Sequence, residues 1–85
     1  MKVLIPSPLL SYTKVREVQA SGATLGDLLL DLERQYPGIR FRMVDEQGNV
    51  RPHIKLFVDS DVTRDLASPI PSGATLMIVA ALSGG

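Results

Sequence analysis

The chain ends in Ser83-Gly84-Gly85, and this terminus has the clearest chemical potential in the sequence. A carboxylate is a poor electrophile, because its charge is delocalised and its leaving group would be oxide. Activation with ATP converts it to an acyl-adenylate, which a sulfur nucleophile can attack. Because glycine lacks a Cβ, a terminal Gly84-Gly85 can enter a narrow channel that excludes larger side chains. The alternative left open at this point is an ordinary frayed end with no task.

The composition excludes several other kinds of site. The 85 residues contain no cysteine and a single histidine, so disulfides, thiolate metal sites and histidine-rich metal sites are ruled out. Nine basic and nine acidic residues give zero net charge, which argues against nucleic acid as the main partner. No apolar run approaches the roughly 20 residues of a membrane span, and no signal-peptide core is present. We therefore expect one cytoplasmic domain that binds no cofactor, metal or membrane.

Strand-like segments are expected to position the terminus. Runs of β-favouring residues predict strands at about 2–5, 15–20, 54–58 and 75–82. The second strand is expected to pair back on the first, and turns or loops are predicted at 59–61 and 65–71. The first and last strands are the most hydrophobic, which indicates that they lie side by side and parallel in the middle of the sheet. Residues 39–50 are expected to be irregular.

One helix is predicted from about Leu25 to Tyr36. Thr24 is a suitable N-cap, and leucines recur at helical spacing to form one apolar stripe. Pro37-Gly38 then ends the helix. The order strand, strand, helix, strand, strand predicts an α+β fold in which a mixed sheet carries one main helix on one face.

Five internal motifs precede the Gly84-Gly85 end in a definite order. They are Val3-Leu4-Ile5-Pro6, Ala23-Thr24-Leu25-Gly26-Asp27-Leu28-Leu29, Tyr36-Pro37-Gly38-Ile39, Ile54-Lys55-Leu56-Phe57-Val58-Asp59 and Ser72-Gly73-Ala74-Thr75-Leu76. In their order and spacing the chain resembles the ubiquitin-like sulfur carriers, the family of the molybdopterin synthase small subunit and the thiamine-pathway sulfur carrier. The resemblance covers essentially the whole chain. It implies a ubiquitin-like β-grasp domain over residues 1–82 and a flexible diglycine tail over 83–85.

The resemblance also implies a function for the terminus. In that family an enzyme related to ubiquitin-activating enzymes uses ATP to adenylate the terminal glycine, and sulfur transfer then yields a thiocarboxylate. Gly85 would carry the activated group, and Ser83 and Gly84 would form the tail that presents it. The chain would be a sulfur carrier, a protein cosubstrate rather than an enzyme. A molybdopterin synthase small subunit and a ubiquitin-like protein modifier are the alternatives that stay open.

Two segments bear on the branch of the family. Ile5-Pro6-Ser7-Pro8-Leu9-Leu10 and the extended loop Glu46-Gln47-Gly48-Asn49-Val50-Arg51 are most similar to carriers of cysteine biosynthesis and of siderophore thiocarboxylates. Those carriers deliver sulfur to a cysteine-synthase-like enzyme, and a metallopeptidase trims some of them to Gly-Gly. No residue follows Gly85 in this sequence. The resemblance favours this branch, and the pathway that receives the sulfur stays open.

Strand alternation predicts which side chains meet a partner. Ile54, Leu56 and Val58 should face the helix, and so should Leu76, Ile78 and Ala80. The outer face should then carry Phe57, Met77, Val79 and Ala81 as an apolar patch beside the tail. Patches of this kind tend to be docking surfaces. Our hypothesis is that the patch docks the activating enzyme; the alternative is that other side chains cover it.

Charged residues after the helix receive a simpler interpretation. Four arginines cluster there in sequence, namely Arg34, Arg40, Arg42 and Arg51. They could meet an acidic partner surface, but exposed basic residues are more often simply solvated. We therefore expect a solvated surface. His53 has no nucleophile partner that would give it a catalytic task, and Asp59 and Asp61 are expected to form a turn rather than to bind a metal.

Overall fold

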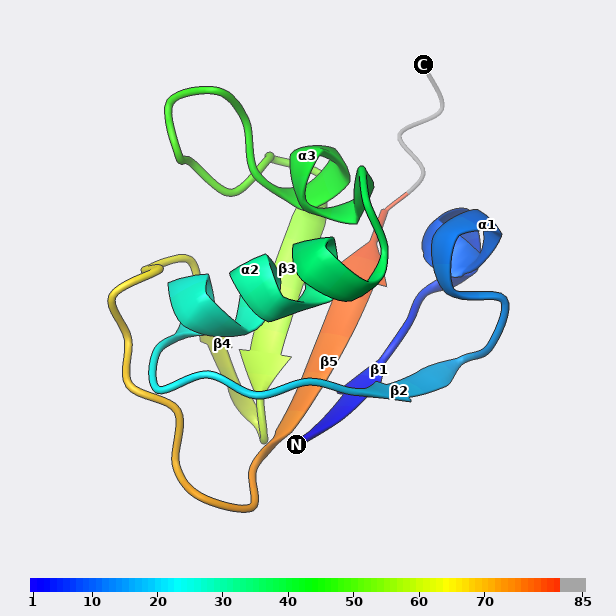
Figure 1. The fold of residues 1–85 in the computed structure, drawn as a ribbon. Coiled ribbons are helices and arrows are strands. Elements are labelled where there is room, and N and C mark those ends of the chain that lie inside the picture. The colour runs from blue at the N-terminus through cyan, green and yellow to red at the C-terminus, as the bar shows by residue number, and fades with distance from the viewer. Residues whose placement is uncertain (82–85) are drawn as a thin grey trace.

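Five short strands form one mixed sheet in the computed structural model, which describes residues 1–81 (Figure 1). The strands are β1 (Lys2–Leu4), β2 (Glu17–Gln19), β3 (Ile54–Val58), β4 (Asp61–Thr63) and β5 (Thr75–Ala80). Their order across the sheet is β2-β1-β5-β3-β4. Only the β1–β5 pair is parallel, and the other three pairs are antiparallel. The predicted central, parallel pairing of the first and last strands is therefore confirmed.

The long helix α2 (Leu25–Gln35) forms where the leucine spacing predicts it. The Thr24 hydroxyl oxygen accepts a hydrogen bond from the Asp27 amide at 3.2 Å, which satisfies one of the amides left unpaired at a helix start. The four leucines of the stripe are fully buried; they are Leu25, Leu28, Leu29 and Leu32. The helix therefore packs its apolar face on the sheet, as expected for an amphipathic helix.

The prediction that residues 39–50 are irregular is wrong for residues 39–43. Residues Ile39–Met43 form a second helix, α3, whose first and last residues are fully buried. Gly38 adopts the left-handed conformation (φ 97°) that turns the chain into α3. The carboxylate of Glu33 then accepts hydrogen bonds from the amides of Gly38 and Arg40, at 2.8 and 3.0 Å. Because this support comes from the preceding helix, the local sequence alone does not reveal α3.

Two further differences concern the strands. The predicted strand over 15–20 is shorter in the structure, because β2 begins at Glu17 and Val15 stays exposed. The chain between β1 and β2 also forms a 3-10 turn, η1 (Ser7–Leu9), and a short helix, α1 (Leu10–Thr13), neither of which was predicted. Strand β4 was missed as well. It follows a tight turn at Asp59, whose φ is 55°, and pairs with β3.

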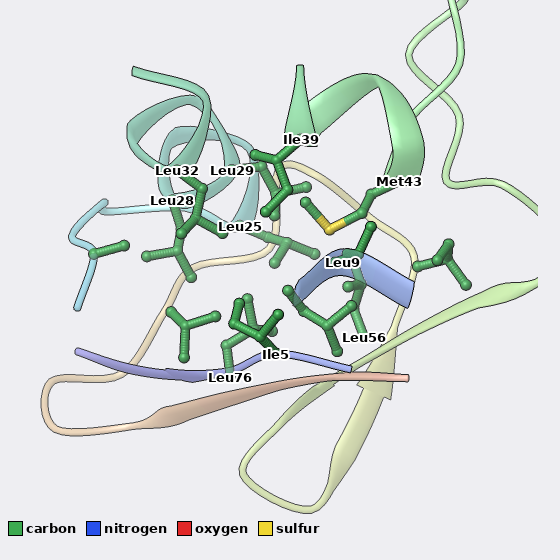
Figure 2. Packing of buried hydrophobic residues seen from close by; sticks show 14 of the residues in the cluster. Ile5, Leu9, Leu25, Leu28, Leu29, Leu32, Ile39, Met43, Leu56 and Leu76 are labelled. Atoms are coloured by element: carbon green, nitrogen blue, oxygen red, sulfur yellow. The ribbon is translucent and has the colours of Figure 1, made fainter. Parts of the chain in front are cut away.

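The core lies between the helices and one face of the sheet (Figure 2). Leucines of α2 and residues Ile39 and Met43 of α3 point toward Leu56 and Leu76 on the sheet in this view. Ile54, Leu56, Val58, Leu76 and Ile78 are buried, and Ala80 packs partly buried against them. The predicted alternation is thus confirmed on β3 and β5. Helices α2 and α3 cover this side, whereas the outward side chains of β3 and β5 on the opposite face remain partly or fully exposed.

Candidate functional site

The described chain ends at Ala81, one residue beyond the central strand β5. The Ala81 amide donates a hydrogen bond to the His53 carbonyl oxygen at 2.8 Å, so the path toward the terminus starts from a fixed point beside β3. The predicted reactive residue Gly85 and the tail residues Ser83 and Gly84 lie outside the described residues. The predicted division into a domain over 1–82 and a tail over 83–85 therefore stays a prediction.

Apolar side chains cross the outer face of the sheet in a single row. The strand registers place Leu4 opposite Met77, Met77 opposite Phe57, and Phe57 opposite Val62. With Val79, these residues form what we call the outer-face patch. Met77, Val79 and Val62 are 39%, 36% and 57% exposed, while Phe57 and Leu4 are half-buried. Contiguous apolar surface of this kind is typical of interaction sites.

The outward placement predicted for Phe57, Met77, Val79 and Ala81 agrees with the structure. Ala81 is exposed and lies just past the end of β5. Leu4 and Val62 are members that the sequence interpretation missed. Alternation along the first strand was sufficient to place Leu4 on the outer face, whereas Val62 depends on β4, which was not predicted.

Charged side chains border the outer-face patch. Lys2 and Glu17, next to each other on β1 and β2, approach to 3.9 Å. Lys55 is exposed and lies opposite Val79 on the neighbouring strand. An apolar centre with a polar rim is the usual anatomy of a protein–protein interface. The surface therefore fits a protein partner better than a small ligand.

Toward the end of β5 the outer face is hollowed into a groove of about 540 Å³. Its walls are mainly apolar and include Leu4, Pro6, Pro8, Met77 and Val79. The groove continues the outer-face patch to Ala80, one residue before the described chain ends. An apolar side chain of a docked partner could occupy it while the terminus of this chain reaches into that partner.

The four arginines do not all share one environment. Arg34 binds the Asp31 carboxylate at 2.6 Å, and this guanidinium, together with the Ser21 amide, holds the pKa of Asp31 below its ordinary value. Arg42 and Arg51, by contrast, line a second groove together with Ala81. The expectation of a solvated basic surface stays a prediction. The structure adds that the fold gathers two of the arginines, Arg42 and Arg51, at the point where the chain leaves the sheet.

Two kinds of feature are absent from the described residues. Within residues 1–81, no group of three or more histidine or carboxylate side chains is placed to hold a metal ion. Over the same residues no helix is long and apolar enough to cross a bilayer.

A mixed sheet of this order, crossed on one face by one main helix, is the ubiquitin-like β-grasp fold. Together with the terminal Gly84-Gly85, the fold defines the class of ubiquitin-like carrier proteins. The ThiS family matches residues 3–85, and the chain belongs to that family. This result confirms the family predicted from the motifs.

Individual relatives show which kind of ThiS-family protein the chain resembles. The chain is 35% identical to the sulfur carrier protein CysO of Mycobacterium tuberculosis over an alignment of 89 positions. The alignment covers 98% of this chain and 96% of the relative. The crystal structure of M. tuberculosis CysO superposes with a TM-score of 0.88 at 32% identity, covering 95% of this chain and 98% of that one. This protein is thus a ThiS-family homologue of a sulfur carrier, as predicted.

Two further solved structures are similar. A chain in the Amycolatopsis orientalis BexX/CysO complex matches with a TM-score of 0.89 at 31% identity, and the match covers 99% of this chain and 98% of that one. SAMP1 of Haloferax volcanii, a small archaeal modifier protein, matches with a TM-score of 0.80 at 25% identity and covers 100% of this chain and 98% of that one. The fold is therefore common to sulfur carriers and to protein modifiers.

Proposed function

We propose that this protein carries sulfur as a thiocarboxylate on Gly85. The Gly85 carboxylate attacks the α-phosphorus of ATP in an adenylating enzyme, pyrophosphate leaves, and an acyl-adenylate forms. A hydrosulfide ion, delivered by a sulfur donor, then attacks the carbonyl carbon. AMP and a proton are released, and the thiocarboxylate remains. The observation that supports this most strongly is the full-length relationship to the sulfur carrier CysO in a chain that ends in Gly84-Gly85.

In this proposal the chain is a cosubstrate and not an enzyme. The ubiquitin-activating-type partner binds ATP and carries out the adenylation, so the carrier itself needs no cofactor. Because that step consumes ATP, we place it in the cytoplasm. A second enzyme, of the cysteine-synthase type or another class, accepts the sulfur. The Amycolatopsis orientalis BexX/CysO complex gives a precedent for a relative that assembles with a further protein.

The outer-face patch is the proposed docking surface for the adenylating enzyme, with Phe57, Met77 and Val79 at its centre and Ala81 just past the end of β5. Four residues follow Ala81, and an extended chain advances at most about 3.5 Å per residue, so Gly85 reaches no more than about 14 Å beyond it. An active site that receives Gly85 must therefore lie close to the base of the tail. The patch and its groove offer apolar surface within that range, and buried apolar area is the main driving force for association.

Intact-mass spectrometry of the protein isolated from its native host tests the proposal. We expect a fraction of the chain with an oxygen-to-sulfur mass increase that fragmentation localises to Gly85. Deletion of Gly85 should abolish both this species and ATP–pyrophosphate exchange with the host's adenylating enzyme. A fully active truncated chain would contradict the proposed role of the terminus.

Protein modification is the second candidate, and the similarity to H. volcanii SAMP1 is the observation that favours it. Adenylation of Gly85 is common to both candidates, so the two differ only in the nucleophile that attacks the acyl-adenylate or its thioester. Peptide mapping of host proteins separates them. Gly-Gly remnants of this chain on lysine side chains, without any thiocarboxylate, would replace the sulfur-carrier proposal by the modifier.

A further inference from the structure

A second groove, of about 360 Å³, lies on the other side of the tail's base from the outer-face patch. Its lining comes from four separate parts of the chain and includes Pro8, Phe41, Arg42, Arg51, His53 and Ala81. Helix α3 supplies two of these residues, the segment before β3 supplies two more, and Ala81 is the last described residue. We call this surface the basic groove.

The positive charge in the basic groove is held in place by the fold. The guanidinium of Arg51 lies over the Phe41 ring, 4.5 Å from its centroid, and its Nε donates to the Phe41 carbonyl oxygen at 2.7 Å. A cation stacked in this way loses little further conformational freedom when it binds an anion. Arg42 is exposed in the last turn of α3, and the exposed His53 also lines the groove.

No carboxylate of the described chain neutralises these arginines. The ion pairs within residues 1–81 join Lys2 to Glu17 and Arg34 to Asp31, and neither involves the basic groove. The residues that line the groove over the same part of the chain include no aspartate or glutamate. In a molecule with zero net charge, this is a local excess of positive charge next to an exposed aromatic ring, Phe41.

The position of the basic groove indicates what covers it. Because Gly85 lies no more than about 14 Å of extended chain from Ala81, any protein that draws Gly85 into an active site brings its own surface against the residues around Ala81. The outer-face patch offers that protein apolar contact. The basic groove, on the other side of the same base, offers charge, which favours a partner surface of opposite sign.

We propose that the basic groove binds an acidic segment of the protein that receives the Gly85 tail. Carboxylates of that segment pair with Arg42 and Arg51, and an aliphatic side chain between them packs on Phe41. The contact orients the tail and accelerates encounter through electrostatic attraction. The identity of the receiving protein rests on the proposed function, whereas the preference of the groove for an acidic segment does not.

Amide chemical shifts of the full-length, ¹⁵N-labelled protein test the preference directly. The probe is an acetylated and amidated peptide of sequence EDLDE, and the control is the matched basic peptide KKLKK. We expect the acidic peptide to shift the amides of Arg42, Arg51, His53 and Ala81, and the basic peptide to leave them in place. Raising the salt from about 20 to about 300 mM should weaken binding at least about fivefold, since the screening length falls severalfold.

Two charge-matched variants locate the effect. Arg42→Glu should weaken binding of the acidic peptide at least about fivefold, and Lys14→Glu, with the same change in charge outside the groove, less than about twofold. Arg42→Gln serves in its place if the spectrum shows that Arg42→Glu disturbs the fold. Any of four outcomes would overturn the inference. The two Glu variants could have equal effects, the shifts could spread over all the lysines, the groove could show no shifts, or the basic peptide could bind equally well.

The outcome is separable from that of the proposed function, because no adenylating enzyme is present in the titration. If the protein binds the acidic peptide at the groove but never acquires sulfur, this inference stands and the proposed function is wrong. If the protein acquires sulfur but shows no response at the groove, only this inference is wrong.

Discussion

The two faces of β5 carry the same kinds of side chain in very different surroundings. Leu76 and Ile78 on the inner face are 0% and 2% exposed beneath α2 and α3, whereas Met77 and Val79 on the outer face remain exposed. All four are apolar, so hydrophobicity alone does not distinguish them. The inner residues stabilise the domain, and the exposed outer residues are the ones that we propose for docking.

The largest effect on stability is expected from Leu76→Ala. Removal of a fully buried leucine side chain leaves a cavity and should lower the free energy of unfolding by about 2–5 kcal/mol. That is a large part of the ~5–15 kcal/mol typical of small domains. The measurement is urea denaturation of both proteins. Met77→Ala is the matched control on the opposite face and should cost less than about 1 kcal/mol; equal losses would break the comparison.

Phe57→Asp should affect docking more than folding. A charge at the centre of the outer-face patch should raise the KM for the carrier in ATP–pyrophosphate exchange about tenfold, equivalent to about 1.4 kcal/mol. The circular dichroism spectrum should stay unchanged. Leu30→Asp is the control, because Leu30 is an exposed leucine of α2 away from the sheet. Unchanged kinetics for Phe57→Asp would remove the patch as the docking surface.

Thr24→Ala tests how much the N-cap of α2, the helix that covers the inner face of the sheet, contributes to stability. Loss of the side-chain acceptor for the Asp27 amide should lower the free energy of unfolding by about 1 kcal/mol. Thr24→Ser keeps the acceptor and should retain most of the stability. Thermal unfolding of the three proteins gives the comparison, and a Ser variant as unstable as the Ala variant would assign the effect to something other than the cap.

The smallest effect is expected from Asp31→Asn on the solvent side of α2. Arg34 and the Ser21 amide lower the pKa of Asp31, so the native state binds its proton less readily than the unfolded chain. The contribution to stability is thus present above the ordinary pKa of 3.8 and is lost as the pH falls through the lower native pKa. The urea midpoints of wild type and variant should differ slightly at neutral pH and converge in acid. A constant difference across that range would exclude the carboxylate as its source.

The sequence predicts those parts of the fold whose signal is local and periodic. The leucine stripe and the Thr24 cap define α2, and alternation along β3 and β5 places Phe57 and Met77 on the outer face. The family follows from the order of several motifs, none of which is specific alone. These features could be predicted because residues close together in the sequence determine them.

The missed elements depend on distant contacts. Helix α3 is five residues long, its amphipathic signal is a single pair, Ile39 and Met43, and its amides are satisfied by Glu33 of another helix. Strand β4 has no alternation of its own and forms only against β3. Without α3, the meeting of Arg42 and Arg51 at Ala81 could not be foreseen, since the two arginines are nine positions apart in the chain. The basic groove is therefore a finding of the structure.

The placement of β5 also has a mechanical consequence. The strand is bonded to β1 on one side and to β3 on the other, and the Ala81 amide adds a hydrogen bond at its end. A pull on the terminus runs along the strand axis, so it loads the hydrogen bonds on both sides together, in shear, and does not peel them apart one by one. An enzyme that holds the terminus therefore pulls on a strand that is paired on both sides, and the domain resists unfolding while its end is being handled.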